Sequence, residues 1–536
     1  MKKKRILSTL LVVALLMGTM VACVPDAPQV ADAPAQGTGQ AAAQTTQTAP
    51  DTAAPQEEVV DVSGEITLAI ATETPSVAPA RHISAIGSMK NLLTHNGLFR
   101  MNYADLEPVP DLVASYHAIN DELWEFTLRE GVMFHNGEEM TAYDVEASFH
   151  YARTFTYGRT AHLSAIDIEV VDRYTFRLHT DGPQASLLID LTHQANMVMP
   201  RSLLDAGHDF NVDPIGSGPF VFEEWRSGDS LTFTAFDNYF DTDRAARIET
   251  VNWRIIPEGA SRTIALEMGE VDYIVEVAFP DIPRLEENPD VTLFYRTGIV
   301  FNFIILNNER PQFSNLYARK AINMAVDQEL LVAAAFDGRA VPIRTQLPPV
   351  FPGVVSDGVV PFDPDGARAL LAEHGIDPES LAFEMLVSTE ERRRMAEVVQ
   401  AQMADIGIPT TITQLDHAAN LAAETAGEHE AGFAQWGGSF LISTLRGVWH
   451  TEIGGRPNRS RVRNEEITRL IDLGSATLDE SARIAVFEEM SRMTNEYVGN
   501  IPTHMNLLFR AFDANLSVPE TSAAGCINLN MIYWNN

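Results

Sequence analysis

The sequence predicts an α/β fold that is divided into more than one domain. Strand-like and helix-like segments alternate along the chain from about residue 64 onward, which is typical of domains with covered sheets. The length of 536 residues exceeds what a single hydrophobic core usually organises, so two or three domains are expected. A hydrophobic content of 45% and a charged content of 21% are typical of a globular chain.

The first 22 residues carry the pattern of a secretory signal peptide. Basic residues at positions 2–5 precede an apolar run over residues 6–17, and small residues follow. An uncleaved membrane anchor is the alternative, but the apolar run is shorter than the roughly 20 residues that a membrane span needs. We therefore expect residues 1–22 to be removed and the protein to work outside the cytoplasm.

The end of this segment, Met20-Val21-Ala22-Cys23, resembles a bacterial lipobox. In such a motif Cys23 is lipidated and becomes the first residue of the mature protein, and several acyl chains hold it firmly at the membrane. Only two cysteines occur in the chain, so no disulfide framework is expected. Cys526 would then be a lone thiol, buried as a small hydrophobe.

Residues 23–62 are predicted to form a lipid-anchored, disordered linker. After Cys23 the segment contains no Lys, no Arg and no aromatic residue, so it cannot bury enough apolar surface to offset the entropy of ordering. A coil of this length has a root-mean-square reach of roughly 35 Å. The folded body would therefore stand off the membrane.

The chain is strongly acidic, with a formal net charge of −35 at pH 7. Such a surface repels nucleic acid and anionic lipid headgroups, so neither is an expected partner. The simplest purpose of the charge is solubility outside the cell.

Individual elements can be placed along the body. A β-rich run predicts a strand over residues 65–72, and helical periodicity covers residues 318–336 and 393–406. The last of these helices buries one apolar face and is followed by a stop glycine and by a strand over residues 409–415. Asp363-Pro364 opens a further helix, with Asp as the N-cap and Pro in the first turn, and Gly375 ends it.

The segment GVMFHNGEEMTAYDVEASFH, residues 131–150, contains two histidines and four carboxylates. A strand over residues 123–128 precedes it, and Thr141 followed three residues later by Asp144 marks the start of a helix. The apolar face of that helix would consist of Val145, Phe149 and Ala152. His135 and His150 fall on different elements without ligand spacing, so we expect neither catalysis nor metal binding from them.

Motifs that would indicate an enzyme are missing from the sequence. It contains no H-E-x-x-H, no G-x-S-x-G and no Walker A run, and no two histidines are three or four residues apart. Gly216-Ser217-Gly218 lacks the lysine of a phosphate loop, which favours a structural turn. We expect no catalysis, no cofactor and no protein-built metal site; a secreted hydrolase is the alternative from another class.

Five segments in order resemble family 5 of the bacterial extracytoplasmic solute-binding proteins, which are the peptide, dipeptide and nickel receptors of ABC importers. The strongest is LWEFTLREGVMFHNGEEMTAYDVEASFHYAR, and it is followed by residues 214–239, 268–272, 318–327 and 457–464. Together they span nearly all of the chain from residue 64 to its end. Each motif alone is weak, but their order behind a lipobox and a linker is specific.

The resemblance implies a two-lobed, type II periplasmic-binding-protein-like fold. Residues 63–300 would form lobe I with an inserted subdomain at about 86–212, residues 301–499 lobe II, and residues 500–536 a return to lobe I. Ligand would bind in the cleft between the lobes and close them by a hinge motion.

The function that the resemblance implies is capture of a peptide or similar small solute and its delivery to the permease subunits of an ABC importer. The protein would be a monomer held at the extracytoplasmic side of the membrane by the lipid on Cys23. The alternatives are a binder of a non-peptide solute, such as an oligosaccharide or a chelated metal, and a surface lipoprotein that binds peptides as a chaperone or signal receptor.

Three short segments are the predicted ligand-binding residues. They are the end of the first strand, a polar pair near the crossing into lobe II, and a run around a tryptophan: Thr72, Glu73 and Thr74; Asn302 and Asn307; Trp436, Gly437 and Ser439. For each segment the alternative is structural, with the aromatic side chain in the core and the polar side chain capping an element.

One departure from the family bears on the ligand. Peptide-binding members typically carry an aspartate shortly after the tryptophan, where it pairs with the α-ammonium of the peptide. Here no acid occurs between Glu430 and Glu452. Because an unpaired buried ammonium costs several kcal/mol, either Glu73 or Asp416 substitutes or the ligand presents no free amine there. Peptide remains the leading ligand class.

Overall fold

The computed structural model describes residues 62, 64–74, 76–81, 85–103, 107–155, 166–437, 441–451, 458–519, 522–523 and 525–535. The predicted signal peptide, Cys23 with nearly all of the linker, and Ser439 lie outside the described residues. None of the described helices has the length and apolar character needed to cross a membrane.

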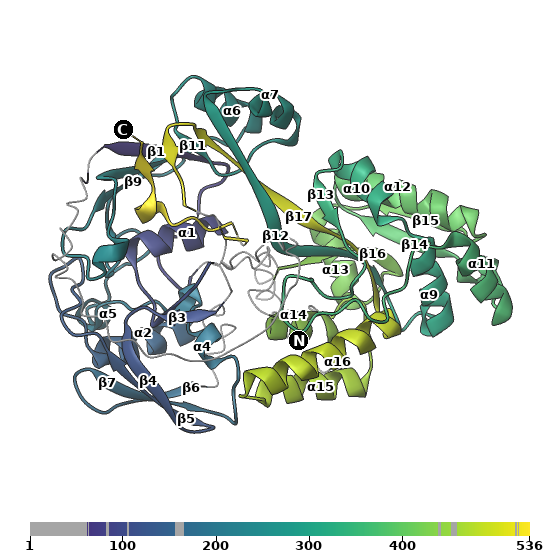
Figure 1. Ribbon diagram of the computed structural model, residues 1–536, viewed down its shortest axis with the longest axis horizontal. Coiled ribbons are helices and arrows are strands. Elements are labelled where there is room, and N and C mark those ends of the chain that lie inside the picture. Colours follow the sequence, from purple (N-terminus) through teal and green to yellow (C-terminus); the bar gives the residue numbers. More distant parts are fainter. Residues whose placement is uncertain are drawn as a thin grey trace, which may run out of the picture.

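One sheet of 11 strands runs through two lobes (Figure 1). In spatial order its strands are β15 (Thr410–Gln414), β14 (Phe383–Val387), β16 (Ala431–Trp436), β12 (Val291–Leu306), β17 (Asn500–Asp513), β11 (Tyr273–Ile274), β1 (Glu65–Ile70), β10 (Thr250–Ile255), β9 (Ser230–Ala235) and β8 (Phe220–Arg226), with β13 (Ala340–Pro342) also on β17. We call residues 64–290 and 514–535 lobe I, and residues 307–499 lobe II. The long antiparallel strands β12 and β17 connect them.

Lobe I combines its part of the sheet with the helices α1 (Ala85–Thr94), α6 (Gly259–Glu267) and α7 (Ile282–Glu286). Its main core forms around the fully buried Trp253 and Phe233, and Tyr273 stacks on Phe512 of β17 at 5.5 Å between ring centroids. The C-terminal strands β18 (Leu516–Ser517) and β19 (Tyr533–Trp534) pair with each other in this lobe. The end of the chain therefore completes lobe I.

A second, four-stranded sheet is inserted in lobe I. It consists of β4 (Val113–Asn120), β5 (Leu123–Leu128), β7 (Thr175–Thr180) and β6 (Ile166–Val170), and it packs with α2 (Ala142–Arg153) around its own core. The predicted start of α2 is confirmed, since the Thr141 amide and hydroxyl both donate to Asp144 Oδ2 at 2.7 Å. The predicted apolar face of Val145, Phe149 and Ala152 is fully buried.

Short elements connect the inserted sheet to the rest of lobe I. They are β2 (Phe99–Met101), β3 (Pro108–Pro110), α4 (Leu187–Asp190) and α5 (Arg201–Asp205). The turn at Gly216-Ser217-Gly218 is structural, as predicted. A Cβ at Gly216 would lie 2.3 Å from Thr94 O, and one at Gly218 would lie 2.4 Å from Leu93 O, so the turn packs against the end of α1.

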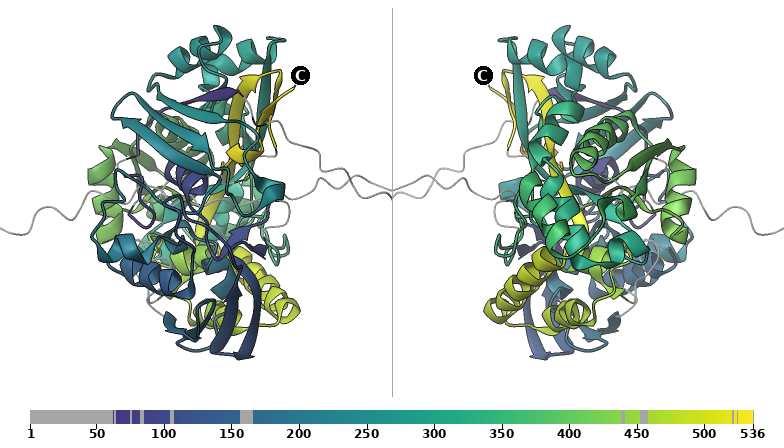
Figure 2. Two further views of the ribbon diagram at one scale, coloured as in Figure 1. Left: turned by 90° about the vertical axis from the view of Figure 1, so that its left-hand side faces the viewer. Right: turned by 90° about the vertical axis from the view of Figure 1, so that its right-hand side faces the viewer.

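Lobe II covers both faces of its part of the sheet with helices. One face packs on α9 (Leu316–Ala325), α10 (Gln328–Phe336), α11 (Pro364–Glu373) and α12 (Glu390–Asp405), and the other on α14 (Leu441–Trp449), α15 (Glu465–Ala476) and α16 (Glu480–Tyr497). Along β12, Ile304 and Leu306 join the first core, whereas Phe303 and Ile305 join the second. Figure 2 shows α16, in yellow-green, beside the dark blue inserted sheet of lobe I.

The remaining helices of lobe II are α8 (Pro311–Ser314) and α13 (His417–Ala426). The prediction of one helix over residues 318–336 is wrong, because Asp327 interrupts it. The Asp327 carboxylate accepts hydrogen bonds from the amides of Glu329 and Leu330, and this capping starts α10 as a separate helix. The Asp363 cap of α11 is confirmed, and α12 begins three residues before the predicted position.

Cys526 differs from the sequence prediction. Its side chain is fully buried in the lobe I core, as expected, but the residue is disulfide-bonded. The prediction of a lone thiol is therefore wrong.

Candidate functional site

The parallel strands of lobe I point toward lobe II. β17 runs from lobe II into lobe I, and β11 pairs with it in the antiparallel sense, with Tyr273 opposite Phe512. β1 is parallel to both β11 and β10. The carboxyl ends of these three strands therefore lie at the edge of lobe I that faces lobe II.

The parallel strands of lobe II point back toward lobe I. β12 enters lobe II and β16 pairs with it in the antiparallel sense, with Leu306 opposite Ala431 and Phe301 opposite Trp436. β14 is parallel to β16 and to β15. In open α/β sheets ligands bind outside the carboxyl ends of strands, so the two facing edges define the candidate site. We call it the interlobe site.

The predicted residues after β1 have different environments. Thr72 is exposed at the edge of lobe I. Glu73 accepts hydrogen bonds from Trp225 Nε1 at 2.6 Å and from the Gly228 amide at 3.0 Å, so its carboxylate fastens the turn between β8 and β9. Thr74 is buried. Of the three, Thr72 is the one whose side chain is open to solvent.

Beneath this loop lies Lys90, a residue of α1 that the sequence analysis did not select. Its ammonium donates to Thr74 Oγ1 at 2.8 Å and to the carbonyl oxygen of Ser76, and only 2% of the residue is exposed. Burial lowers the pKa of Lys90 to about 7. This lysine holds the loop after β1 on α1.

Trp436 and Gly437 lie at the facing edge of lobe II. Trp436 is the last residue of β16, is half-buried, and packs its ring against Gly447 of α14. Its indole Nε1–H has no hydrogen-bond acceptor within the part of the chain that the structure describes. Gly437 follows it and is also half-buried, which leaves the backbone accessible at this edge.

Asn302 lies where the crossing strands meet this edge. It is opposite Gln435 of β16, and its Nδ2 donates to Asn506 Oδ1 of β17 at 2.8 Å. The side chain is half-buried. The structure therefore brings Asn302 close to Trp436, since their direct neighbours Phe301 and Gln435 pair with them across β12 and β16.

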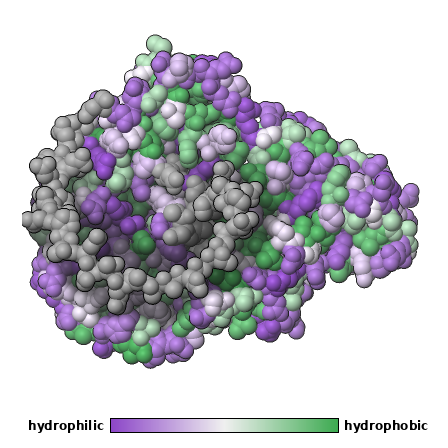
Figure 3. Space-filling view, viewed as in Figure 1, coloured by the Kyte–Doolittle hydropathy of each residue, from purple (hydrophilic) through white to green (hydrophobic). Residues whose placement is uncertain are grey.

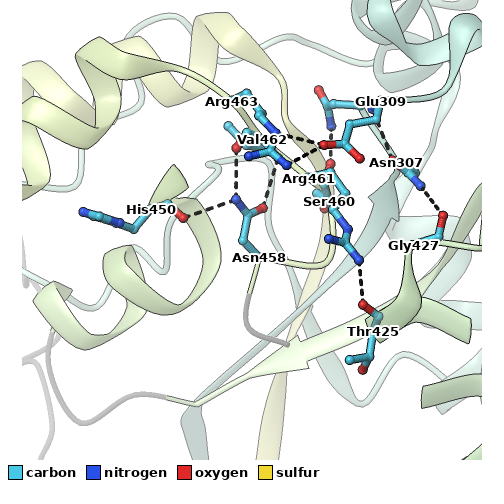
Figure 4. A network of polar contacts seen from close by, with 11 residues as sticks. Asn307, Glu309, Thr425, Gly427, His450, Asn458, Ser460, Arg461, Val462 and Arg463 are labelled. Atoms are coloured by element: carbon cyan, nitrogen blue, oxygen red, sulfur yellow. Dashed lines mark hydrogen bonds and ion pairs between the residues drawn. The ribbon is translucent and has the colours of Figure 1, made fainter. Parts of the chain in front are cut away.

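Asn307, at the far end of β12, is used within the fold. It is 1% exposed, and its Nδ2 donates to the carbonyl oxygens of Gly427 at 3.1 Å and His429 at 3.0 Å. Its Oδ1 accepts from the amide of Glu309 at 3.2 Å. Figure 4 shows this side chain in a polar network that fastens residues 458–463 to lobe II. Asn307 lies away from the facing edges and is not part of the interlobe site.

Arg392 is a site residue that the sequence analysis missed. It lies in the first turn of α12, a few residues after β14 ends at the facing edge of lobe II. The one hydrogen bond of its guanidinium to the described residues is a long contact of 3.4 Å from Nη1 to Ser388 Oγ. The surrounding run, EERRR, has the appearance of a solvated helix start, so composition gave no signal.

The charges near Arg392 leave it without a close carboxylate. Burial lowers its pKa, Glu424 opposes this effect, and Arg459 reinforces it. Glu424 itself is paired with Arg459 Nη1 at 2.7 Å. Because an arginine stays protonated at neutral pH, Arg392 keeps N–H donors that no described acceptor uses, close to the carboxyl end of β14.

The lobes also touch at a second place. The amide of Ala185, just before α4 in lobe I, donates to the carbonyl oxygen of Ser475 in α15 at 3.0 Å. Figure 1 shows α15 and α16 next to the inserted subdomain on that side of the molecule. The interlobe site is therefore bounded by the crossing strands at one end and by this backbone contact at the other.

Metal binding has no visible basis in the described part of the chain. No group of three or more His, Cys, Asp or Glu residues there is arranged to hold a metal ion. Hydrophilic residues (purple) are frequent along the upper, lower and right-hand rim of the molecule in Figure 3.

The family of the chain follows from a comparison with family models. Residues 107–444 match the model described as bacterial extracellular solute-binding proteins, family 5 Middle. The chain belongs to this family. The family 5 chain is thus an extracytoplasmic solute-binding protein of the kind that serves ABC importers.

Two relatives and two solved structures are similar over most of the chain. The glutathione-binding protein GsiB of Salmonella paratyphi A is 27% identical over 66% of this chain and 70% of its own length. Heme-binding protein A of Haemophilus influenzae is 26% identical over 75% of this chain and 80% of its own length.

The structure of HbpA2 from Haemophilus parasuis superposes with a TM-score of 0.81 and 22% identity, covering 88% of this chain and 100% of that one. The structure of the binding protein DppA from Helicobacter pylori, in complex with the peptide STSA, superposes with a TM-score of 0.73 and 22% identity. It covers 89% of this chain and 99% of the DppA chain. These likenesses confirm the two-lobed fold of the family 5 protein.

Proposed function

We propose that this family 5 protein captures a small solute with a carboxylate, of the peptide class, in the interlobe site and delivers it to an ABC permease. The observation that carries this proposal is the set of unused donors at the edge of lobe II. The Arg392 guanidinium makes a single long hydrogen bond and the Trp436 indole N–H makes none among the described residues. A carboxylate is an acceptor-only group that suits a guanidinium in bidentate geometry.

The residues named as substitutes for the missing ammonium anchor are already occupied. Asp416 caps α13 by accepting from the amides of Ala418 and Ala419, both at 3.0 Å, and Glu73 holds the turn between β8 and β9. We therefore propose that recognition relies on the carboxylate end of the ligand and on its backbone acceptors, with Thr72, Asn302 and Gly437 lining the site.

The ligands that name the two relatives support this chemistry. Glutathione and heme differ greatly in size and shape, but each carries two carboxylates. A non-peptide acid, including a metal held by a carboxylate chelator, is the second candidate, because the donors at Arg392 and Trp436 do not require an amine in the ligand. We further propose that lipidation of Cys23 holds the protein at the outer face of the membrane as a monomer; this proposal requires that Cys23 is not the disulfide partner of Cys526.

The test is calorimetry with peptides of two to five residues, chosen from ligands identified by mass spectrometry of the protein purified from its host. Amidating the carboxyl terminus should weaken binding about 10- to 100-fold, since a charged hydrogen-bond pair contributes roughly 1.5–3 kcal/mol. Acetylating the amino terminus should have little effect. Tight binding that acetylation abolishes would overturn the proposed mode.

Arg392→Gln should reproduce the effect of amidation and make the protein insensitive to it. Arg393→Gln is the matched control, because Arg393 is the adjacent residue of α12 but is paired with Glu390 and Glu397 on the surface. If the two variants bind the ligand equally well, Arg392 does not contact it.

A further inference from the structure

A cavity of about 200 Å³ lies inside lobe I, apart from the interlobe site. Its walls are α1, β2 and the segment that contains and follows α4, and Asn528 of the C-terminal segment closes one side. None of the described residues that line it belongs to lobe II. We call it the lobe I cavity.

Two arginines line this cavity and only one of them has a partner. Arg244 Nη1 lies 3.1 Å from Asp111 Oδ1 and 3.8 Å from Asp241 Oδ2. Arg100 is half-buried, and its guanidinium makes no direct hydrogen bond or ion pair with any described residue. Burial lowers the pKa of Arg100 and the nearby Arg244 lowers it further, whereas Asp111 and Asp241 raise it. Because arginine remains charged at neutral pH, this partly desolvated guanidinium feels two carboxylates but donates to neither of them.

The remainder of the lining is amphiphilic. Leu92, Phe99, Met101, Ile189 and Met197 supply apolar walls. Tyr103 also lines the cavity, and burial raises the pKa of its phenol to about 12, so the hydroxyl is a donor rather than an anion at neutral pH. A cavity with unused cationic donors on one side and apolar walls on the other suits a ligand with one anionic end and an apolar body.

The carboxylate of Asp111 limits which ligands the cavity can bind. Asp111 lines the wall, so a dianion such as phosphate would meet repulsion that a single negative charge partly avoids. Asp111 already pairs with a cation, since its two oxygens accept from Arg244 and from Asn96 Nδ2 at 2.8 Å, so it attracts an ammonium less than an unpaired carboxylate would. This arrangement disfavours free amino acids and favours acids without an amine.

We propose that the lobe I cavity is a second binding site, which takes a small monocarboxylate with an apolar body and places the carboxylate on Arg100. The site is independent of the interlobe site, because the described residues that line it all belong to lobe I. Occupancy would give the Arg100 guanidinium a direct hydrogen-bond acceptor and would stabilise lobe I, more strongly for a ligand of higher affinity.

The probe is phenylacetate, with phenylacetamide as its neutral control and inorganic phosphate as the dianion control. Calorimetry and thermal unfolding of the purified mature protein should show that phenylacetate binds, raises the melting temperature and is preferred over both controls by at least tenfold. Arg100→Gln should abolish the preference over phenylacetamide, and Arg100→Lys should retain part of it. No binding of phenylacetate up to 10 mM, or equal binding of phenylacetamide, would overturn the proposal.

Arg392→Gln separates the two sites. This variant should weaken binding of the transported ligand and leave phenylacetate binding unchanged. Arg100→Gln should weaken phenylacetate binding and leave binding of the transported ligand unchanged. If Arg392→Gln abolishes phenylacetate binding, the probe occupies the interlobe site and the inference fails. Arg100→Gln should also change the melting temperature of the unliganded protein only slightly, because the guanidinium has no direct hydrogen bond to lose and burial and Arg244 oppose its attraction to Asp111 and Asp241; a marked drop would indicate a structural role instead.

Discussion

Trp436 packs against the backbone of Gly447 so closely that a Cβ at Gly447 would lie 2.3 Å from Cζ2 of the indole. This contact fixes the ring at the end of β16, where the sheet of lobe II faces lobe I. A glycine in the middle of a helix usually lowers helix stability by about 1 kcal/mol relative to alanine. At this position the missing side chain makes room for the indole.

Gly447→Ala should therefore displace Trp436 and weaken ligand binding by at least tenfold, although alanine favours the helix. Tryptophan fluorescence and calorimetry measure the two effects. The clash should also lower the stability of Gly447→Ala. Adding Trp436→Phe should recover that stability, because phenylalanine lacks the Cζ2 and Cη2 atoms that would meet the new Cβ. An unchanged affinity in Gly447→Ala would show that the position of the ring does not matter for binding.

Lys90 predicts an increase of stability with pH. Its pKa in the folded protein is about 7, below its usual value of 10.5, so between these values the unfolded chain binds the proton and the folded protein does not. The free energy of unfolding should rise with pH across this window, by a few kcal/mol at most. Lys90→Met should remove the rise, and urea unfolding at pH 6.5, 8 and 9.5 measures it. If the free energy of unfolding of the variant rises equally with pH, titratable groups other than Lys90 cause the rise.

Two buried histidines predict that the protein loses stability at acidic pH. His95 and His504 are at most 1% exposed, and burial lowers their pKa values to about 3 and about 4. As the pH falls from 6.5 toward 4, the unfolded chain takes up protons that the folded protein excludes, so stability is lost by an amount on the order of 3 kcal/mol for each histidine. His504→Gln should reduce the loss between pH 6.5 and 4.5 in urea titrations. The prediction fails if the variant is as acid-sensitive as the parent.

The fate of Cys23 can be tested by mass. Changing Cys23 to Ser should release the protein into soluble fractions or leave the signal peptide uncleaved. Because the chain contains two cysteines, a disulfide of Cys526 within one chain requires the sulfur that lipidation would consume. The intact mass after alkylation distinguishes lipidation of Cys23 from an intrachain disulfide. If Cys23 is lipidated, alkylation of the unfolded chain without reductant should modify one thiol. Two thiols that appear only after reduction, on a protein without lipid, would contradict the anchor.

Much of the fold was accessible from the sequence because its signals are local. The Thr141 cap, the Asp363 cap and the apolar stripe of α12 depend on residues within one or two turns of each other. The break between α9 and α10 was missed because Asp327 is compatible both with a helix surface and with a cap. Only the packing of Val326 and the neighbouring helices decides between the two.

The candidate site was only partly accessible, for a different reason. Trp436 and Asn302 lie in strands at the facing edges, which a local pattern can indicate, whereas Glu73 and Asn307 form polar contacts with residues more than 100 positions away. Arg392 and Arg100 gave no signal, because an arginine without a partner looks the same in sequence as one in a surface ion pair. Only the distances in the folded structure show whether an arginine has a partner.

The place of β17 in the sheet has a consequence for how the protein reaches its compartment. This strand, from residue 500 onward, lies between β12 and β11, and Cys526 and Ile527 belong to the core of lobe I. Lobe I therefore cannot finish folding until nearly the whole chain has left the ribosome, and its central contacts join segments more than 200 residues apart. A chain that stays incomplete for so long is well suited to cross a membrane unfolded and to acquire its binding site only on the far side.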